Sequence, residues 1–235
     1  PILEPASRVP DKELNPATLE PELNIAQVYD ALIMGIRDYF SKMGFSKAIV
    51  GSSGAGKSTL LHILGTLDQP DQGELSMNGE NLIKLQRDNL ADFRNQRIGF
   101  IFQFHNLLPE FTAQENIMIP GLIRGTSPAE LQKRSAELAE ILGISHRLDH
   151  KPSTLSGGEQ QRVAVARALI NSPDVVFADE PSGNLDTNNA RSLHELFFKL
   201  RKELKKAFVI VTHNEELAGM ADRKVVMQDG LIISS

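Results

Sequence analysis

Residues 47–64, which read KAIVGSSGAGKSTLLHIL, decide the fold of this chain. The residues at 47–50 predict a short strand, and residues 57–64 have helical character. The turn that joins them consists of glycine, serine and alanine alone, so its backbone can come close to a ligand. The order of strand, glycine-rich turn and helix predicts a phosphate-binding loop in an α/β fold.

The same turn satisfies a stricter pattern: glycine, any four residues, glycine, lysine, then serine or threonine. The residues expected to surround a phosphate chain are Gly51, Ser52, Ser53, Gly54, Ala55, Gly56, Lys57, Ser58 and Thr59. Backbone N–H groups of the small residues would turn toward the β-phosphate, and the helix start adds its positive end. Lys57 would reach the β and γ oxygens, and the Ser58 hydroxyl would bind Mg²⁺. A flexible glycine-serine turn is the alternative, which the flanking strand and helix disfavour.

Composition restricts the class of protein. The chain has 235 residues, 41% hydrophobic and 23% charged, which suits a globular protein with a substantial core. Its formal net charge of −5 gives no global attraction to polyanions, so we expect no nucleic-acid partner. The absence of cysteine excludes disulfides, thiolate zinc sites and a cysteine nucleophile. The sequence has no apolar run of about 18 residues and no signal-peptide pattern, so we expect a cytoplasmic location.

Apolar runs alternate with helical segments along the rest of the chain. The runs at 175–178 and 208–211 are uninterrupted, which is typical of strands buried on both faces of a parallel sheet. Further strands are expected at 98–102 and at 74–77, which leads into a hairpin turn, and helices from about 127, at 156–171 and at 188–204. We predict a three-layer α/β fold of the P-loop NTPase type, with a mostly parallel sheet. Residues 51–103 and 159–235 would form the core, and residues 104–158 an inserted helical subdomain.

Two carboxylates, Asp179 and Glu180, follow the first of these runs. Ligands of open α/β sheets bind at the carboxyl ends of the strands, so both side chains are expected beside the phosphate loop. Asp179 would hold a magnesium ion through water, and Glu180 would polarise the water that attacks the phosphate. Taken alone, an acidic pair after a strand is at least as often a surface turn.

The segment LSGGEQ at 155–160 opens a predicted helix. Ser156 and Glu159 have the spacing of a capping box, which by itself is an ordinary helix start. Capping does not explain the adjacent Gly157 and Gly158, because glycine inside a helix costs about 1 kcal/mol relative to alanine. A helix start with bare N–H groups and a serine hydroxyl is suited to an anion.

These motifs together resemble those of the nucleotide-binding subunits of ABC transporters, over residues 51–235. The resemblance implies that Ser156, Gly157 and Gly158 grip the γ-phosphate of ATP held by a second subunit, so that two chains enclose two nucleotides.

The resemblance assigns three further sites. Gln103 matches a glutamine that contacts magnesium and water, and His213 matches a histidine that contacts the γ-phosphate. Residues 184–186 match the loop that follows the acidic pair. The cofactors implied are ATP and Mg²⁺.

Partners are implied as well. Within the family, residues 51–68 and 102–112 are similar to the ATPases of lipoprotein-releasing transporters, with macrolide-exporter ATPases as close relatives. In the family, such subunits lie on the cytoplasmic face of the inner membrane and bind transmembrane permease subunits. The side chains that would face the permease are Phe104, Leu107, Leu108 and Phe111. The alternative is that they pack the helical subdomain.

The N-terminus departs from the family pattern, which normally begins with an antiparallel strand pair carrying an aromatic residue against adenine. Residues 1–24 are proline-rich and are predicted to form a tether. Residues 25–50, a predicted helix at about 25–43 followed by the strand, resemble part of glutamine-dependent NAD synthetase. We therefore predict an engineered chimera, joined near Gly51, that holds adenine weakly and is mostly monomeric. Tyr29 lies in the predicted helix and is not assigned to adenine.

Three functions follow from these observations. The first is an ABC-type ATPase that powers lipoprotein release or export. The second is a chimera that binds phosphate and has no biological activity. The third is an amide ligase of the NAD synthetase type, which the absence of that family's SGG and DS loop disfavours.

Overall fold

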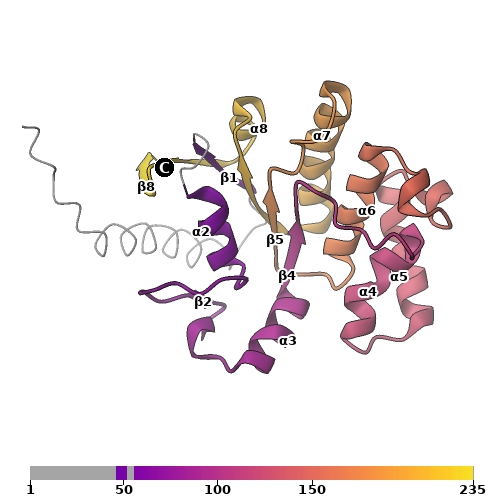
Figure 1. The fold of residues 1–235 in the computed structure, drawn as a ribbon, viewed down its shortest axis with the longest axis horizontal. Coiled ribbons are helices and arrows are strands. Elements are labelled where there is room, and N and C mark those ends of the chain that lie inside the picture. Colours follow the sequence, from indigo (N-terminus) through magenta and orange to yellow (C-terminus); the bar gives the residue numbers. More distant parts are fainter. Residues whose placement is uncertain (1–45, 52–55, 235) are drawn as a thin grey trace, which may run out of the picture.

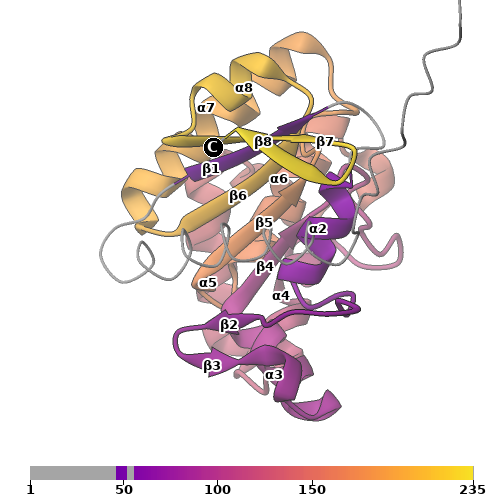
Figure 2. The same ribbon diagram turned by 90° about the vertical axis from the view of Figure 1, so that its left-hand side faces the viewer.

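The computed structural model describes residues 46–51 and 56–234, and a six-stranded sheet lies at its centre (Figure 1). In spatial order the strands are β4 (Ile98–Ile101), β5 (Val175–Asp179), β6 (Ala207–Thr212), β1 (Ser46–Gly51), β7 (Arg223–Gln228) and β8 (Leu231–Ser234). All neighbouring pairs are parallel except β7 and β8, which are antiparallel. Figure 2 shows this order across the sheet.

Helices and a hairpin surround the sheet. The α-helices are α2 (Lys57–Leu64), α3 (Arg87–Arg97), α4 (Ala113–Ile123), α5 (Pro128–Ile141), α6 (Gly157–Leu169), α7 (Thr187–Leu204) and α8 (Glu215–Gly219). Short 3₁₀ helices are η1 (Leu82–Lys84), η2 (Ser145–Arg147) and η3 (Pro152–Thr154), and the hairpin consists of β2 (Ser76–Met77) and β3 (Glu80–Asn81). In the described ranges, no helix combines the length and the apolar character needed to cross a membrane.

Strand β5 shows how three layers arise. Val175 and Phe177 belong to one buried cluster, which includes residues of α2 and of the hairpin. Val176 and Ala178 point to the opposite face and belong to a second cluster with residues of α4, α5, α6 and α7. Because successive side chains of a strand alternate between faces, an uninterrupted apolar run can fill both clusters. Figure 1 shows α2 on one side of the sheet and α6 and α7 on the other.

Most segments with a strong local pattern form the predicted element. The strands predicted at 47–50, 98–102, 175–178 and 208–211 are β1, β4, β5 and β6, and the predicted helices are α2, α5, α6 and α7. Ser127 caps α5 as expected, because its hydroxyl accepts the Glu130 N–H at 3.3 Å. The predicted parallel sheet is confirmed.

Three helices and the last two strands were not predicted, because their sequences carry weak patterns. Helix α3 has no buried residue and packs only through partly buried Leu90 and Phe93. Helix α4 is apolar with Pro120 inside it, and α8 is a single short turn. Strand β7 begins with two charged residues. Tertiary packing, rather than local periodicity, determines these elements.

The predicted hairpin forms at Asn78 and Gly79, whose φ angles of 53° and 83° are left-handed. Its first strand starts two residues later than predicted, at Ser76. Within the described part of the chain, β2 pairs with β3 alone. The tether predicted at 1–24 and the helix predicted at 25–43 lie outside the described residues.

Candidate functional site

The candidate site begins at the junction between β1 and α2. Gly56, the residue before α2, has a left-handed backbone with φ 82° and offers no side-chain cap to the helix. A helix start of this kind, with backbone N–H groups toward the turn, suits an anion. Residues 52–55, the middle of the predicted phosphate loop, lie outside the described residues.

Side chains from α2 and from the end of β5 meet at this junction. The Ser58 hydroxyl donates a hydrogen bond of 3.0 Å to Asp179 Oδ1. Lys57 Nζ lies 3.9 Å from Glu180 Oε1, and both of these side chains are largely buried. The acidic pair therefore faces the helix start, not the open solvent of a surface turn.

Glu180 connects this group to the end of β6. Its second oxygen, Oε2, lies 2.9 Å from His213 Nδ1. Its φ of 43° is left-handed, which is uncommon for a residue with a side chain, and its N–H donates to the Val211 carbonyl at 2.9 Å. The hydrogen bond to β6 stabilises this conformation, in which the carboxylate lies between Lys57 and His213.

Asp179 has the environment of a cation ligand. Burial raises the pKa of its carboxyl, because the charged form loses hydration, while the hydrogen bond from Ser58 lowers it. His62, one turn after Ser58 on α2, lies with Nε2 4.0 Å from Asp179 Oδ2. A carboxylate and a hydroxyl are the hard oxygen donors that suit Mg²⁺, which also keeps water and phosphate ligands. In the ranges that the structure describes, no cluster of three or more His, Cys, Asp or Glu side chains could hold a metal.

Gln103, just after β4, contacts the loop that follows Glu180. Its Nε2 donates to Asn184 Oδ1 at 3.1 Å, and Asn184 Nδ2 donates back to the Gln103 carbonyl at 3.0 Å. A Cβ on Gly183 would lie only 2.8 Å from Gln103 Nε2, so the Gln103 side chain would have to shift to admit it. Among the described residues, Gln103 makes no hydrogen bond to Asp179 or Glu180. The structure thus places Gln103 against residues 184–186.

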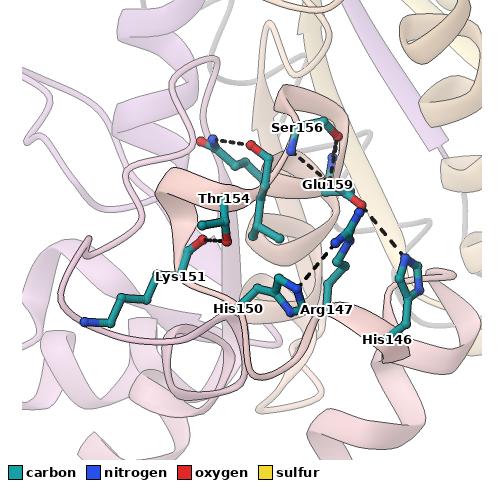
Figure 3. A network of polar contacts seen from close by, with 9 residues as sticks. His146, Arg147, His150, Lys151, Thr154, Ser156 and Glu159 are labelled. Atoms are coloured by element: carbon teal, nitrogen blue, oxygen red, sulfur yellow. Dashed lines mark hydrogen bonds and ion pairs between the residues drawn. The ribbon is translucent and has the colours of Figure 1, made fainter.

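The predicted capping box at the start of α6 is confirmed (Figure 3). The Ser156 N–H donates to Glu159 Oε2 at 2.8 Å, and the Glu159 N–H donates to Ser156 Oγ at 3.3 Å. The capping box accounts for the serine and the glutamate of LSGGEQ, and leaves its two glycines unexplained.

Packing within the chain restricts one of those glycines. A Cβ on Gly158 would lie 2.9 Å from Asn189 Oδ1 of α7, so the end of this side chain would have to shift. A Cβ on Gly157 would meet Leu185 Cδ2 at 3.7 Å, an ordinary contact. Among the described residues, none therefore excludes a Cβ at Gly157.

The start of α6 is separate from the motif side chains that meet around Asp179 and Glu180 at the sheet edge. No hydrogen bond or ion pair among the described residues joins Ser156 to Ser58, Asp179 or His213. Helices α2 and α6 lie on opposite faces of the sheet (Figure 1). The predicted site residues therefore form two separate groups within this chain.

Two residues near these groups escaped the sequence reasoning. His62 could have been found, because it lies four residues after Ser58 and so on the same face of the predicted helix. Arg147, whose Nε–H donates to Glu159 Oε1 at 2.6 Å, belongs to the preceding loop. No local spacing rule connects it to the signature segment.

The chain is similar to known transporter subunits. The sequence model of the family described as ABC transporter matches residues 42–183. A lipoprotein-releasing system ATP-binding protein, LolD, of Cytophaga hutchinsonii is 60% identical over 196 residues, 83% of this chain and 90% of that protein. LolD of Bacteroides thetaiotaomicron is 57% identical over 185 residues, 79% of this chain and 85% of that protein. The dimeric structure of MJ0796, a bacterial ABC transporter cassette, matches with a TM-score of 0.75 and 39% identity, covering 82% of this chain and 85% of that one.

These findings bear on the chimera junction that the sequence analysis predicts near Gly51. The family match starts at residue 42, so β1 lies inside the matched segment. The resemblance to NAD synthetase and the chimera joined near Gly51 gain no support from the comparisons. The predicted α/β fold of the P-loop NTPase type is confirmed by its likeness to the solved cassettes. The chain therefore belongs to the ABC transporter family.

Proposed function

We propose that the chain is an ATPase that binds Mg-ATP at the carboxyl edge of its sheet and powers lipoprotein release by a membrane complex. The observation that carries the proposal is the meeting of Lys57, Ser58, Asp179, Glu180 and His213 beside an uncapped helix start. Phosphoryl transfer requires this combination of a cation, metal ligands and a group that orients water. The names of the LolD relatives support lipoprotein release as the process.

In this proposal the helix start and Lys57 bind the phosphate chain, because both offer N–H donors with positive charge. Ser58 and Asp179, which are already in contact, would hold the magnesium ion. When bound, the ion neutralises charge on the phosphate oxygens during transfer.

Glu180 accepts a hydrogen bond from the water that attacks the γ-phosphorus. The new bond forms between that water and phosphorus while the water's proton passes to the Glu180 carboxylate, and the bond to the bridging oxygen breaks, so ADP leaves with the electron pair. His213, whose Nδ1 lies 2.9 Å from Glu180 Oε2, would donate to a γ-phosphate oxygen. Gln103 would have to release Asn184 before it could contact the ion or the water.

The start of α6 would serve a nucleotide held by a second copy of the chain. It lies across the sheet from α2, and no described residue excludes a Cβ at Gly157. A ligand outside the chain supplies a reason for this glycine, since bare N–H groups can approach a phosphate closely. One similar solved structure is described as a dimeric post-hydrolysis state bound to ADP and Pi.

The face between α3, β4, α4 and α6 would receive a permease subunit at the cytoplasmic side of the membrane. It carries a groove of about 390 Å³ lined in part by Phe100, Phe102 and Ile123. Ile123 is 73% exposed and nearby Phe104 is 69% exposed, as a docking surface requires. Leu108 and Phe111 are exposed too, whereas Leu107 packs partly against the core.

The experiment compares Lys57→Ala with Glu180→Gln. Lys57→Ala should abolish ATP binding measured by calorimetry. Glu180→Gln should keep binding and lose phosphate release, because it removes the carboxylate that orients water and little of the binding surface. Unchanged ATP affinity in the first variant, or unchanged turnover in the second, would contradict the proposal.

Adenine binding needs a separate test, because the residues predicted to replace the aromatic strand pair lie outside the described part. Loss of one base–aromatic stack, about 1–3 kcal/mol, corresponds to roughly 5-fold to 150-fold weaker ATP. Calorimetry with ATP, GTP and inorganic triphosphate should therefore show little preference for adenine, and light scattering should show a chain that is mostly monomeric until Mg-ATP is saturating. Tight binding that is selective for adenine would contradict this expectation.

A further inference from the structure

Glu159 has a partner beyond its own helix. Arg147, the last residue of η2, donates its Nε–H to Glu159 Oε1 at 2.6 Å (Figure 3). The other oxygen, Oε2, accepts both the Ser156 N–H at 2.8 Å and the Ser156 hydroxyl at 2.9 Å. One carboxylate therefore connects an arginine of the preceding loop with the serine of the LSGGEQ segment.

This carboxylate stays charged at neutral pH. The pKa of Glu159 is lowered to about 2, first by the hydrogen bond from the Ser156 N–H and further by Arg147. A charged carboxylate only accepts hydrogen bonds, so the Ser156 hydroxyl must act as the donor in their contact. The geometry of Glu159 thus determines where the Ser156 oxygen and its lone pairs point.

Arg147 itself is held by its surroundings. Ile144 on one side is buried, and Leu148 on the other packs against the core. The carbonyl of Leu148 accepts the Gln114 N–H at 2.9 Å, which ties this loop to the first turn of α4. An arginine on such a support can hold Glu159 in one place.

We propose that Arg147 is a positioning residue for the anion site at the start of α6. By holding Glu159, it fixes the Ser156 hydroxyl and the N–H groups of Gly157 and Gly158 in the direction of a phosphate on a second chain. In this role Arg147 acts through Glu159 and needs no contact of its own with the nucleotide. The inference rests on the proposed function, since the ligand it serves is the nucleotide of the other copy.

A simple stabilising ion pair is the alternative, and it predicts different results. An exposed ion pair contributes little and acts on overall stability alone. A positioning arginine acts on the site through Glu159, so its effect must depend on that carboxylate. Arg134→Ala is the matched control, because Arg134 forms a 3.2 Å ion pair with Glu137 on α5 in the same region of the chain.

The first measurement is amide hydrogen exchange of the full chain without nucleotide. Arg147→Ala should speed exchange of the Ser156 and Glu159 amides by about 10-fold, a loss of protection of about 1.4 kcal/mol. Arg134→Ala should leave both amides unchanged. Arg147→Lys keeps the charge and the side-chain stem, and should restore part of the protection. Unchanged exchange in Arg147→Ala would overturn the inference.

The second measurement is association by light scattering in the Glu180→Gln chain with saturating Mg-ATP. Adding Arg147→Ala should raise the chain concentration at half-association by about 10-fold. The ATP affinity of the separate chain should not change, because the phosphate loop is intact. In a chain that also carries Glu159→Gln, Arg147→Ala should add little, because the arginine acts through that carboxylate.

Each outcome has a distinct meaning. If the Glu180→Gln chain never associates with Mg-ATP, the proposed function fails, and the amide exchange alone decides whether Arg147 holds Ser156. If it associates and Arg147→Ala behaves like the Arg134→Ala control, the positioning role is overturned. The positioning role would also be overturned if Arg147→Ala weakened association equally in the chain with Glu159 and in the chain with Glu159→Gln. The arginine would then act by a route other than that carboxylate.

Discussion

Helices α4 and α6 begin with the same local structure. In α4, the Thr112 N–H donates to Glu115 Oε2 at 2.7 Å, and the Glu115 N–H donates to Thr112 Oγ1 at 3.2 Å. In α6 the matching bonds of Ser156 and Glu159 are 2.8 and 3.3 Å. Both are complete capping boxes, so capping cannot be what distinguishes the two helices.

The two helix starts differ in their first helical residues and in the partner of the glutamate. Helix α4 continues with a fully buried Ala113, and Glu115 has no ion pair within the described ranges. Helix α6 continues with two glycines, and Arg147 binds its glutamate. A capping box is therefore common to both helix starts, and the glycines and the arginine-bound glutamate are the features that our proposal links to a ligand at α6.

The largest expected difference concerns the two capping hydroxyls. Thr112→Ala and Ser156→Ala should each lower the free energy of unfolding by about 1 kcal/mol, because each removes a cap. Only Ser156→Ala should also lower ATP turnover, by about 10-fold to 100-fold, the value of one hydrogen bond to a charged group. Urea unfolding and phosphate release measure the two effects. Equal turnover in both variants would remove the distinction between the helices.

The second difference concerns the first residue of each helix. Gly157→Ala should weaken association of the Glu180→Gln chain with Mg-ATP by about 10-fold, because a methyl group would stand between the N–H groups and a phosphate. The same change should stabilise the fold by up to about 1 kcal/mol, since alanine favours helix and finds room there.

Ala113→Gly in α4 is the reciprocal control for this prediction. It should lower stability by about 1 kcal/mol or more, through lost packing and helix propensity, with no effect on association. If Gly157→Ala left association intact, the first glycine of α6 would not serve a ligand.

The smallest difference concerns pH. The lowered pKa of Glu159 means that its charged form stabilises the fold above about pH 4.5, and that this contribution is lost as the pH falls toward 2. Glu159→Gln should therefore cost stability at pH 6 and cost much less near pH 2.5. The pKa of Glu115 is lowered too, by its hydrogen bonds with Thr112, without an arginine partner. Glu115→Gln should show the same sign with a smaller pH dependence, measured by urea unfolding at several pH values.

Local patterns predicted the central elements and which motif side chains meet at the sheet edge. The strands ending at Gly51 and Asp179 carry uninterrupted apolar runs, and the motif residues at their ends meet as a parallel sheet requires. The left-handed backbone of Glu180 could not be predicted, because it depends on a hydrogen bond that its N–H donates to Val211 of β6, a neighbour in space.

Contacts between distant segments were out of reach for the same reason. Gln103 and Asn184 are 81 positions apart, and only the fold brings their amides together. Helix α4 has apolar residues on all sides, so its sequence gives no helical face to recognise. Arg147 reaches Glu159 through a loop whose course is set by packing. In each case the feature depends on the tertiary fold, which local sequence patterns do not contain.

The central claim is that the sheet edge of one chain and the α6 start of another form one site, and complementation tests it most directly. Lys57→Ala disables the sheet edge and keeps the α6 start. Gly157→Glu keeps the sheet edge and places a negative charge at the α6 start, where a side chain has room. Each variant alone should hydrolyse almost no ATP, and a mixture of the two should regain turnover, because each mixed pair contains one complete site. A mixture as inactive as its components, at concentrations where the unaltered chain hydrolyses ATP, would contradict the account.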